Sequence, residues 1–83
     1  MSIQAVREII EKHARLTTKV ETLADDADLY GAGLNSMSTV NLMLALEDHF
    51  DVEFTEKMLG RKTFSTIQSL SGAIDELLAG KNA

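Results

Sequence analysis

Residues 31–50, GAGLNSMSTVNLMLALEDHF, decide the fold, because a loop containing two glycines meets a long apolar helix there. Asn35 is a good N-cap residue, and the pattern after it predicts a helix from Ser36 to Phe50. A phosphodiester built on the Ser36 hydroxyl would lie beside unpaired backbone N–H groups, at the positive end of the helix dipole. Ser36 could instead serve only to cap the helix, and this loop alone leaves both interpretations open.

The predicted helix has two apolar stripes on opposite sides when its residues are placed at about 100° per step. The stripe that we expect in the core consists of Thr39, Leu42, Met43, Leu46 and Phe50. The opposite side carries Met37, Val40 and Leu44, followed by Asn41, Glu47, Asp48 and Asp51. This second side is apolar near its start and acidic near its end. It could bind a partner protein or pack on another helix.

Two further helices are predicted on either side of this one. The first runs from about Ser2 to Arg15, with Ser2 as its N-cap. The last begins with a capping box of Ser65 and Gln68 and closes at Gly80. Its apolar stripe consists of Ile67, Leu70, Ile74, Leu77 and Leu78.

The connections are also informative. Residues 17–35 have no clean period, but they carry apolar anchors at Val20, Leu23, Leu29, Tyr30 and Leu34, which predicts a packed loop across the bundle. Gly31 and Gly33 permit a tight backbone before the second helix. A short turn of helix is predicted over Thr55–Leu59, stopped by Gly60. No strand pairing is expected around Val52–Phe54.

Length and composition indicate one domain over residues 1–83, with 45% hydrophobic and 25% charged residues. The net charge of −5 argues against binding to nucleic acid or to an anionic membrane, and it suits partners with basic patches. The chain has no cysteine, which excludes disulfides, thiolate ligands and a protein thiol nucleophile. The charged N-terminal segment predicts neither a signal peptide nor a membrane span, so a cytoplasmic location is expected.

No metal site and no catalytic site are expected. An EF-hand loop starting at Asp26 would need a ligand at Tyr30 and a glutamate at Met37, so the acidic loop containing Asp25 and Asp28 is expected to be solvated. His13 and His49 lie on different predicted helices without a ligand pattern. No nucleophile with a base partner can be assembled, so the chain is not expected to be an enzyme.

The segment GLNSM, followed by STVNLMLALEDHFDVEF, resembles the acyl carrier proteins and the carrier domains of thiotemplate synthases. The positions that match the family pattern are Thr39, Val40, Leu42, Leu46, Glu47 and Phe50. The resemblance implies an all-α, acyl-carrier-like four-helix bundle, with three longer helices, a short third helix and a long loop between the first two. It also implies that a phosphopantetheinyl transferase attaches 4′-phosphopantetheine from coenzyme A to Ser36. The terminal thiol of that arm then carries cargo as a thioester.

The chain departs from typical fatty-acid carriers beside the serine. Asn35 replaces the usual aspartate, and Ser38 and Asn41 stand where acidic residues are usual. The segments ADDADLYGAGLNSM, LMLALEDHFDVEF and LGRKTFSTI are closer to the small bacterial aminoacyl carrier proteins. Stand-alone ligases that resemble seryl-tRNA synthetases load those proteins. The basic pair before the last helix in that group matches Arg61 and Lys62.

The resulting hypothesis is a monomeric carrier that holds a small amino acid on Ser36 and delivers it to a downstream transferase. The residues predicted to dock partners are Met37, Val40, Asn41, Leu44, Glu47, Asp48, Arg61 and Lys62, with Asn35 flanking the attachment point. Arg61 and Lys62 could contact the loading enzyme, contact the phosphate of the arm, or only be solvated. A carrier of fatty or polyketide acyl groups, loaded by an acyl-loading enzyme, and an unmodified helical adaptor are the alternatives.

Overall fold

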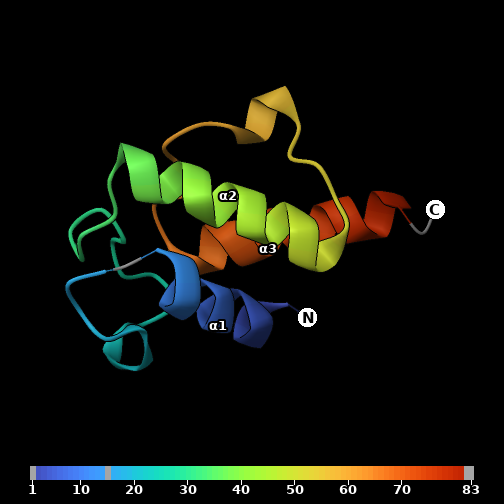
Figure 1. The fold of residues 1–83 in the computed structure, drawn as a ribbon. Helices are drawn as coiled ribbons and strands as arrows, with labels where there is room; N and C mark the ends of the chain where they lie inside the picture. The colour runs from blue at the N-terminus through green and yellow to red at the C-terminus, as the bar shows by residue number, and fades with distance from the viewer. Residues whose placement is uncertain (1, 15, 82–83) are drawn as a thin grey trace.

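Three α-helices form the framework of the chain (Figure 1). The structure, a computed structural model, describes residues 2–14 and 16–81. In order, the elements are α1 (Ile3–His13), the 3-10 turn η1 (Val20–Thr22), α2 (Ser36–Phe50), the 3-10 turn η2 (Glu56–Met58) and α3 (Ile67–Lys81). These residues contain no β-strand, in agreement with the expectation for Val52–Phe54. The bounds of α2 are those predicted.

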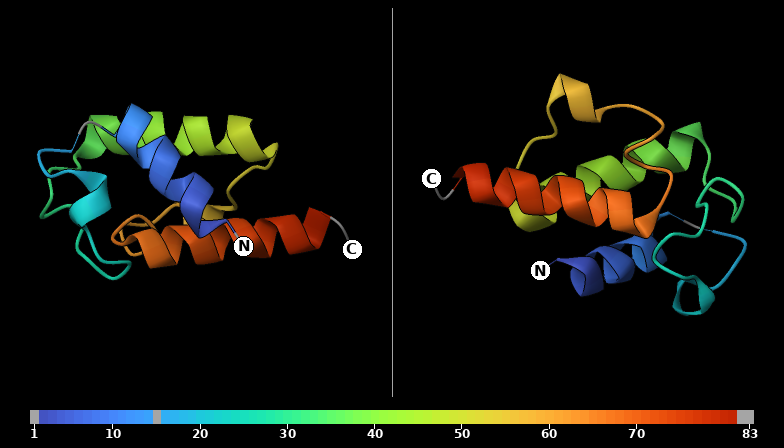
Figure 2. Two further views of the ribbon diagram at one scale, coloured as in Figure 1. Left: turned by 90° about the horizontal axis from the view of Figure 1, so that it is seen from below. Right: turned by 180° about the vertical axis from the view of Figure 1, so that it is seen from behind.

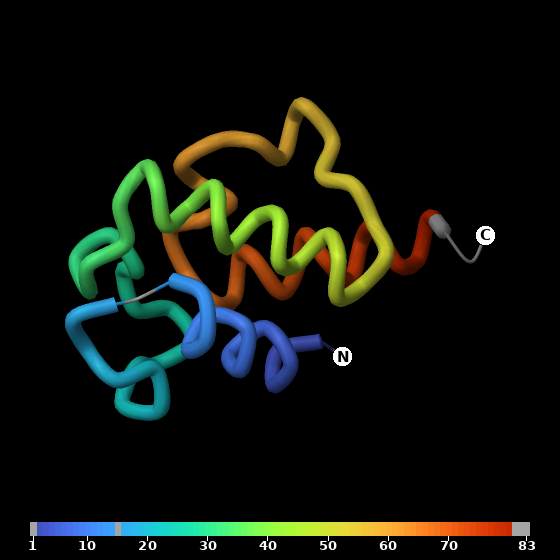
Figure 3. The backbone as a smooth tube through the Cα atoms, viewed as in Figure 1, coloured from blue at the N-terminus to red at the C-terminus, as the bar shows by residue number. Residues whose placement is uncertain are grey.

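The helices α2 and α3 run in the same direction, and α1 crosses them in the opposite sense (Figure 2). α1 packs against both of the other helices. Because α2 and α3 are parallel, the segment 51–66 has to return along the whole molecule before α3 begins, as the tube in Figure 3 shows. The start of α2 lies at the end of the molecule opposite the end of α3 (Figure 1).

The core lies between the three helices and follows the predicted apolar stripes. Its buried helix residues are Val6, Ile9 and Ile10 of α1, Leu42 and Leu46 of α2, and Ile67, Leu70, Ala73 and Ile74 of α3. Thr39, Met43, Phe50, Leu77 and Leu78 are half-buried at the edge of this core. Each fully buried Leu or Ile stabilises the fold by roughly 1.5–3 kcal/mol relative to an exposed one. The predicted inner side of α2 is therefore confirmed.

The loop between α1 and α2 is packed, as predicted. Val20, Leu29 and Leu34 are buried in the core, and Leu23 and Tyr30 are half-buried. In Figure 3 the loop lies below the start of α2 and stays close to the helices. The backbone of a loop of this length has no regular hydrogen-bond ladder of a helix or sheet to hold it. Buried apolar side chains therefore have to keep it in place.

Polar contacts fasten the same loop to both neighbouring helices. The Arg7 guanidinium of α1 donates to the carbonyls of Val20 (3.0 Å) and Leu23 (2.9 Å) and forms an ion pair with Asp25. On the other side, the Gln68 N–H donates to the Asp25 carbonyl at 2.9 Å. The loop thus links α1 to the start of α3.

The first helix differs from its predicted ends. Ser2 does stand at the N-cap position, but its side chain makes no capping hydrogen bond. Its hydroxyl donates instead to Asp75 Oδ1 of α3 at 2.6 Å, which ties the N-terminus to the last helix. α1 ends at His13, and the predicted last residue, Arg15, lies outside the described residues.

The prediction of a four-helix bundle was wrong in its count, although the described residues are all-α as predicted. Within residues 2–14 and 16–81 there are three α-helices, and the expected short helix over Thr55–Leu59 is the single 3-10 turn η2. Only Met58 of that segment is even partly buried. A short segment with no apolar face to pack does not recover the cost of nucleating an α-helix.

The ends of α3 also differ from the prediction. The capping box joins Thr66 and Ser69 instead of Ser65 and Gln68: the Ser69 N–H donates to Thr66 Oγ1 at 2.9 Å, and the Thr66 N–H donates to Ser69 Oγ at 3.2 Å. Ser65 and Gln68 are engaged elsewhere, because the Ser65 carbonyl accepts from Leu29 and the Gln68 N–H binds the loop. Gly80 does not close the helix, which continues to Lys81.

Gly33 is required by the turn before α2. Its φ is +115°, and a Cβ there would stand 2.8 Å from the backbone nitrogen of Thr17. We expect Gly33→Ala to lower the free energy of unfolding by about 1–3 kcal/mol, because an L side chain is strained in this conformation. Urea denaturation followed by circular dichroism measures the change.

Gly72→Ala is the matched control for that substitution. Gly72 is an exposed position of α3 where an added Cβ meets nothing within 4 Å. Alanine should raise stability there by roughly 0.5–1 kcal/mol, since glycine is the poorer helix former. Equal stability of wild type and Gly33→Ala would contradict the requirement for glycine at the turn.

Candidate functional site

A reciprocal pair of hydrogen bonds fixes the start of α2. The Ser38 N–H donates to Asn35 Oδ1 at 2.9 Å, and the Asn35 N–H donates to Ser38 Oγ at 2.9 Å. The Asn35 carbonyl also accepts from Thr39 Oγ1 at 2.7 Å. Asn35 is therefore the N-cap, as predicted, and Ser38, a buried residue, completes a capping box that the sequence analysis did not identify.

In this arrangement the Ser36 hydroxyl does not take part in capping the helix. Ser36 is the first residue of α2 and is exposed, and its hydroxyl forms no hydrogen bond with any described residue. The interpretation that Ser36 merely caps the helix is therefore wrong, because Asn35 and Ser38 perform that role. An exposed hydroxyl that the fold does not use is free to be modified.

The backbone around Ser36 suits an attached phosphate. The N–H groups of Ser36 and Met37 belong to the first turn of α2, where an α-helix offers them no carbonyl partner. The dipole of a 15-residue helix adds partial positive charge at this end. A phosphodiester on Ser36 would therefore find donors and a favourable field, and the residues present fit a phosphopantetheine group.

A groove of about 350 Å³ opens beside Ser36, between the start of α2 and the segment that returns toward α3. Its lining residues are Tyr30, Ser36, Thr39, Val40, Met43, Leu59, Gly60, Arg61 and Phe64. Apolar side chains make up most of this lining. The groove therefore brings together three parts of the chain: the loop before α2, the start of α2 and the segment that returns toward α3.

Arg61 is held in this groove by an aromatic ring. Its guanidinium carbon lies 3.9 Å from the centroid of the Tyr30 ring, in a cation–π contact. Lys62, the other half of the predicted basic pair, is exposed but does not line the groove. The structure thus separates the two cations that the sequence presents as a pair.

The outer stripe of α2, defined here as Met37, Val40 and Leu44, does not pack on another helix. These side chains are 77%, 51% and 55% exposed, respectively. Leu59, from the segment after η2, is 51% exposed and shares the groove with Val40. Leu59 and Tyr30 were not identified as site residues, because segments without a period give no signal of what they face.

The acidic end of α2 is only partly available to a partner. Asn41 and Asp48 are exposed, as predicted for a docking face. Glu47 is half-buried, and its Oε2 accepts the backbone N–H of Phe54 at 2.9 Å. Part of the predicted docking charge therefore holds the loop after α2 in place.

The remaining acidic and histidine residues form no metal site. Asp25 is paired with Arg7, and Asp28 Oδ1 accepts the Tyr30 N–H at 3.1 Å. His13 and His49 line one pocket of about 210 Å³ between α1 and α2, yet no group of residues in the described part of the chain has the composition and arrangement to hold a metal ion. None of the helices in residues 2–14 and 16–81 is long and apolar enough to cross a membrane.

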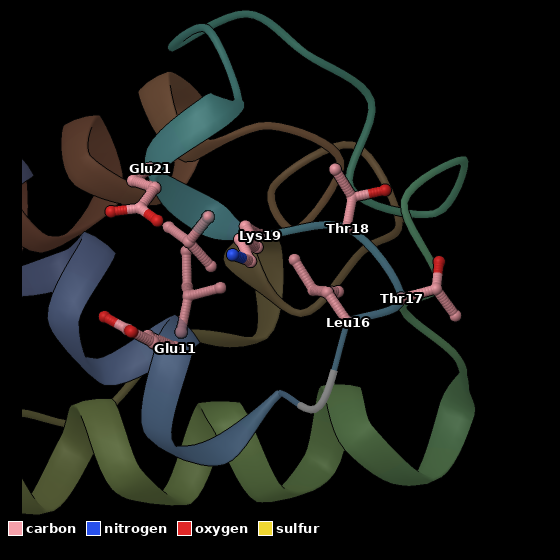
Figure 4. A pocket seen from close by; sticks show the side chains of 8 residues that line it. Glu11, Leu16, Thr17, Thr18, Lys19 and Glu21 are labelled. Atoms are coloured by element: carbon pink, nitrogen blue, oxygen red, sulfur yellow. The ribbon is translucent and has the colours of Figure 1, made fainter.

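A second pocket, of about 390 Å³, lies between the end of α1 and the following loop (Figure 4). Side chains of both charges surround it, including Glu11, Lys19 and Glu21. It shares no lining residue with the groove beside Ser36. This pocket is therefore separate from the groove beside Ser36.

Comparison with known proteins agrees with this geometry. The family model described as "Phosphopantetheine attachment site" matches residues 4–74. An aminoacyl carrier protein of Agrobacterium fabrum is 46% identical over 78 residues, which cover 94% of each chain.

Solved structures give the same picture. A carrier protein from Agrobacterium tumefaciens, in complex with an engineered Bradyrhizobium japonicum glycine:[carrier protein] ligase and ATP, aligns with a TM-score of 0.86 at 42% identity, over 92% of this chain and 99% of that one. A holo acyl carrier protein from Nitrosomonas europaea aligns with a TM-score of 0.84 at 31% identity, over 95% and 98% of the two chains.

The capping box predicts a clear division among three neighbouring residues. Asn35→Ala and Ser38→Ala should each lower the free energy of unfolding by about 0.5–2 kcal/mol, because each removes a capping partner. Ser36→Ala should stay within roughly 0.5 kcal/mol of wild type, because its hydroxyl has no partner to lose. Thermal and urea unfolding of the three variants measure this, and a Ser36→Ala loss as large as that of Asn35→Ala would contradict the assignment.

Proposed function

The chain belongs to the phosphopantetheine-attachment family, and from that premise we propose that it carries an amino acid as a thioester on a 4′-phosphopantetheine arm attached to Ser36. Proteins of this family are substrates of partner enzymes, so the chain is a carrier and not an enzyme. The single observation that carries the assignment of Ser36 is its exposed, unbonded hydroxyl at the first turn of α2.

The arm, derived from coenzyme A, supplies the thiol that the chain itself lacks. The chain contributes position. The capping box holds the backbone of Ser36, the unpaired N–H groups of the first turn would donate to the phosphate, and Ser36 lines the groove on one side of the attachment point. A tether of this kind raises the effective concentration of the cargo at each active site that the arm can reach.

An amino acid is favoured as the cargo by the similar proteins. The relative at 46% identity is named an aminoacyl carrier protein, and one structural neighbour is bound to a glycine:[carrier protein] ligase. A small amino acid loaded by a ligase of that kind is therefore our proposal for this chain. A fatty or polyketide acyl cargo is less favoured, because the holo acyl carrier protein is the more distant neighbour, at 31% identity.

The partners follow from the same proposal. A phosphopantetheinyl transferase would modify Ser36, an amino acid:carrier protein ligase would load the arm, and a downstream transferase would accept the cargo. The monomeric state and the cytoplasmic location stay predictions.

The docking surface that we propose is the outer stripe of α2 with Asn41 and Asp48. Its apolar members are exposed next to Ser36, and fully desolvated apolar contacts supply most of the energy of such interfaces. Asp48 adds charge at the far end, where a basic partner would be steered. Glu47 contributes less than expected from the sequence, because its carboxylate already binds the Phe54 N–H.

Intact-mass analysis tests the attachment. After incubation with coenzyme A and a broad-specificity transferase, wild type should gain one arm and Ser36→Ala none. Ser65→Ala serves as the control, since Ser65 lies in the return segment and its substitution should leave modification unchanged. An arm found on another residue, or none on wild type, would refute the assignment of Ser36.

A second incubation of the modified protein tests the cargo. With ATP, a candidate ligase and single amino acids, we expect one small amino acid to be added as a thioester that hydroxylamine releases. Failure of every amino acid, together with efficient fatty-acyl loading, would favour the acyl alternative.

Substitution of the outer stripe tests the docking surface. Leu44→Asp should lower kcat/KM for ligase loading by at least about tenfold, or ~1.4 kcal/mol, because a charge would be desolvated at the interface. Ala79→Asp, an exposed position near the end of α3, introduces the same charge and should load like wild type. Equal loading of the two variants would exclude α2 as the docking face.

A further inference from the structure

The groove beside Ser36 contains a cation that no acidic residue neutralises. Arg61 is the one cation among the described residues that line this groove. The Arg61 guanidinium forms no ion pair with a described residue and donates no hydrogen bond to one. Apart from water, its partner is the Tyr30 ring. The guanidinium donors are therefore available to an anion.

The backbone that carries the ring beneath Arg61 is held by hydrogen bonds on both sides of Tyr30. The Tyr30 N–H donates to Asp28 Oδ1 at 3.1 Å, and the Tyr30 carbonyl accepts from the Gly33 N–H at 3.2 Å. The preceding residue, Leu29, is fully buried. A guanidinium stacked on the ring of a residue anchored in this way is partly ordered before any ligand arrives, which lowers the entropy cost of binding.

The other residues of the groove indicate which anion Arg61 would bind. If Ser36 is modified as proposed above, the phosphodiester is built on a residue that lines the groove together with Arg61. It adds negative charge to a chain that already has a net charge of −5. A local cation offsets that repulsion, and Lys62 does not line the groove.

We propose that Arg61, stacked on Tyr30, binds the phosphodiester of the arm attached to Ser36. The inference rests on the proposed function. The planar fork of a guanidinium matches two phosphate oxygens, which an ammonium group does not. Arg61 is exposed, so the contact is weak and salt sensitive, and the arm leaves the groove readily when a partner enzyme takes it. Of the roles considered for the basic pair, this assigns Arg61 to the arm and leaves Lys62 in solvent.

Phosphorus NMR of the modified full-length chain tests this contact without any partner enzyme. The protein carries a single phosphodiester, so its ³¹P line reports on the environment of the arm. Arg61→Gln should displace this line by more than its width and narrow it, because the phosphate loses its partner and moves more freely. Lys62→Gln, which removes the same charge one residue away, should leave the line in place.

Three further measurements sharpen the result. Arg61→Lys should give an intermediate line, since it keeps the charge but loses the fork. Tyr30→Leu should weaken the effect of Arg61, since the platform is gone. In wild type, molar salt should move the ³¹P line toward that of Arg61→Gln. At this ionic strength the Debye length is about 3 Å, so the attraction between the guanidinium and the phosphate is largely screened. Amide spectra check that each variant keeps the fold, which is expected for Arg61 because it is exposed and lies outside the helices.

Two outcomes would overturn the proposal. One is the same ³¹P line in wild type and Arg61→Gln, which would mean that the phosphate does not touch Arg61. The other is an equal displacement by Arg61→Gln and Lys62→Gln, which would mean that only the general charge matters. In both cases the mass of the modified protein still reports an arm on Ser36, so the proposed function would stand. Absence of the arm would refute both the proposed function and the proposed role of Arg61.

Discussion

The paired hydrogen bonds between Asn35 and Ser38 are the interaction on which the rest of the site depends. They determine that α2 begins at Ser36, so the serine lies in the first turn with its hydroxyl unused. Burial of Leu42 in the core fixes the rotation of the same helix and leaves Leu44 exposed. A cap shifted by one residue would place a different residue at the first position of the helix, about 100° around the axis from Ser36.

The parallel arrangement of α2 and α3 builds the surroundings of that serine. Because both helices run in one direction, the segment 51–66 must return past α2, and it carries Leu59 and Arg61 to the groove. The loop after α1 delivers Tyr30 to the same place and is held there by its own contacts with α1 and α3. Two connections without regular structure therefore form most of the site. The end of α3 lies at the opposite end of the molecule, away from the site (Figure 2).

The surface of α2 divides its polar groups between the fold and a partner. Glu47 shows why a charge on the outer side of a helix cannot be assigned to docking from its position alone, because it satisfies the Phe54 N–H where the chain leaves α2. Ser38 shows the same for a neutral residue, since it is buried in the capping box. The docking surface that we propose is therefore an apolar stripe with a small number of charges. Such a surface suits brief contacts with several enzymes, which is what a carrier needs.

Local sequence determined α2, its N-cap, the apolar stripes of all three helices and the candidate serine, because capping and the 3.6-residue period depend on residues within a turn or two of one another.

The tertiary structure alone decided the start of α3, where contacts of Leu29 and Asp25 with the backbone of Ser65 and Gln68 moved the cap by one residue. It also reduced the expected short helix to the 3-10 turn η2, because this segment has no apolar face that packs on the core. The stacking of Arg61 on Tyr30 joins residues 31 positions apart from two aperiodic segments, and no local pattern records such a contact.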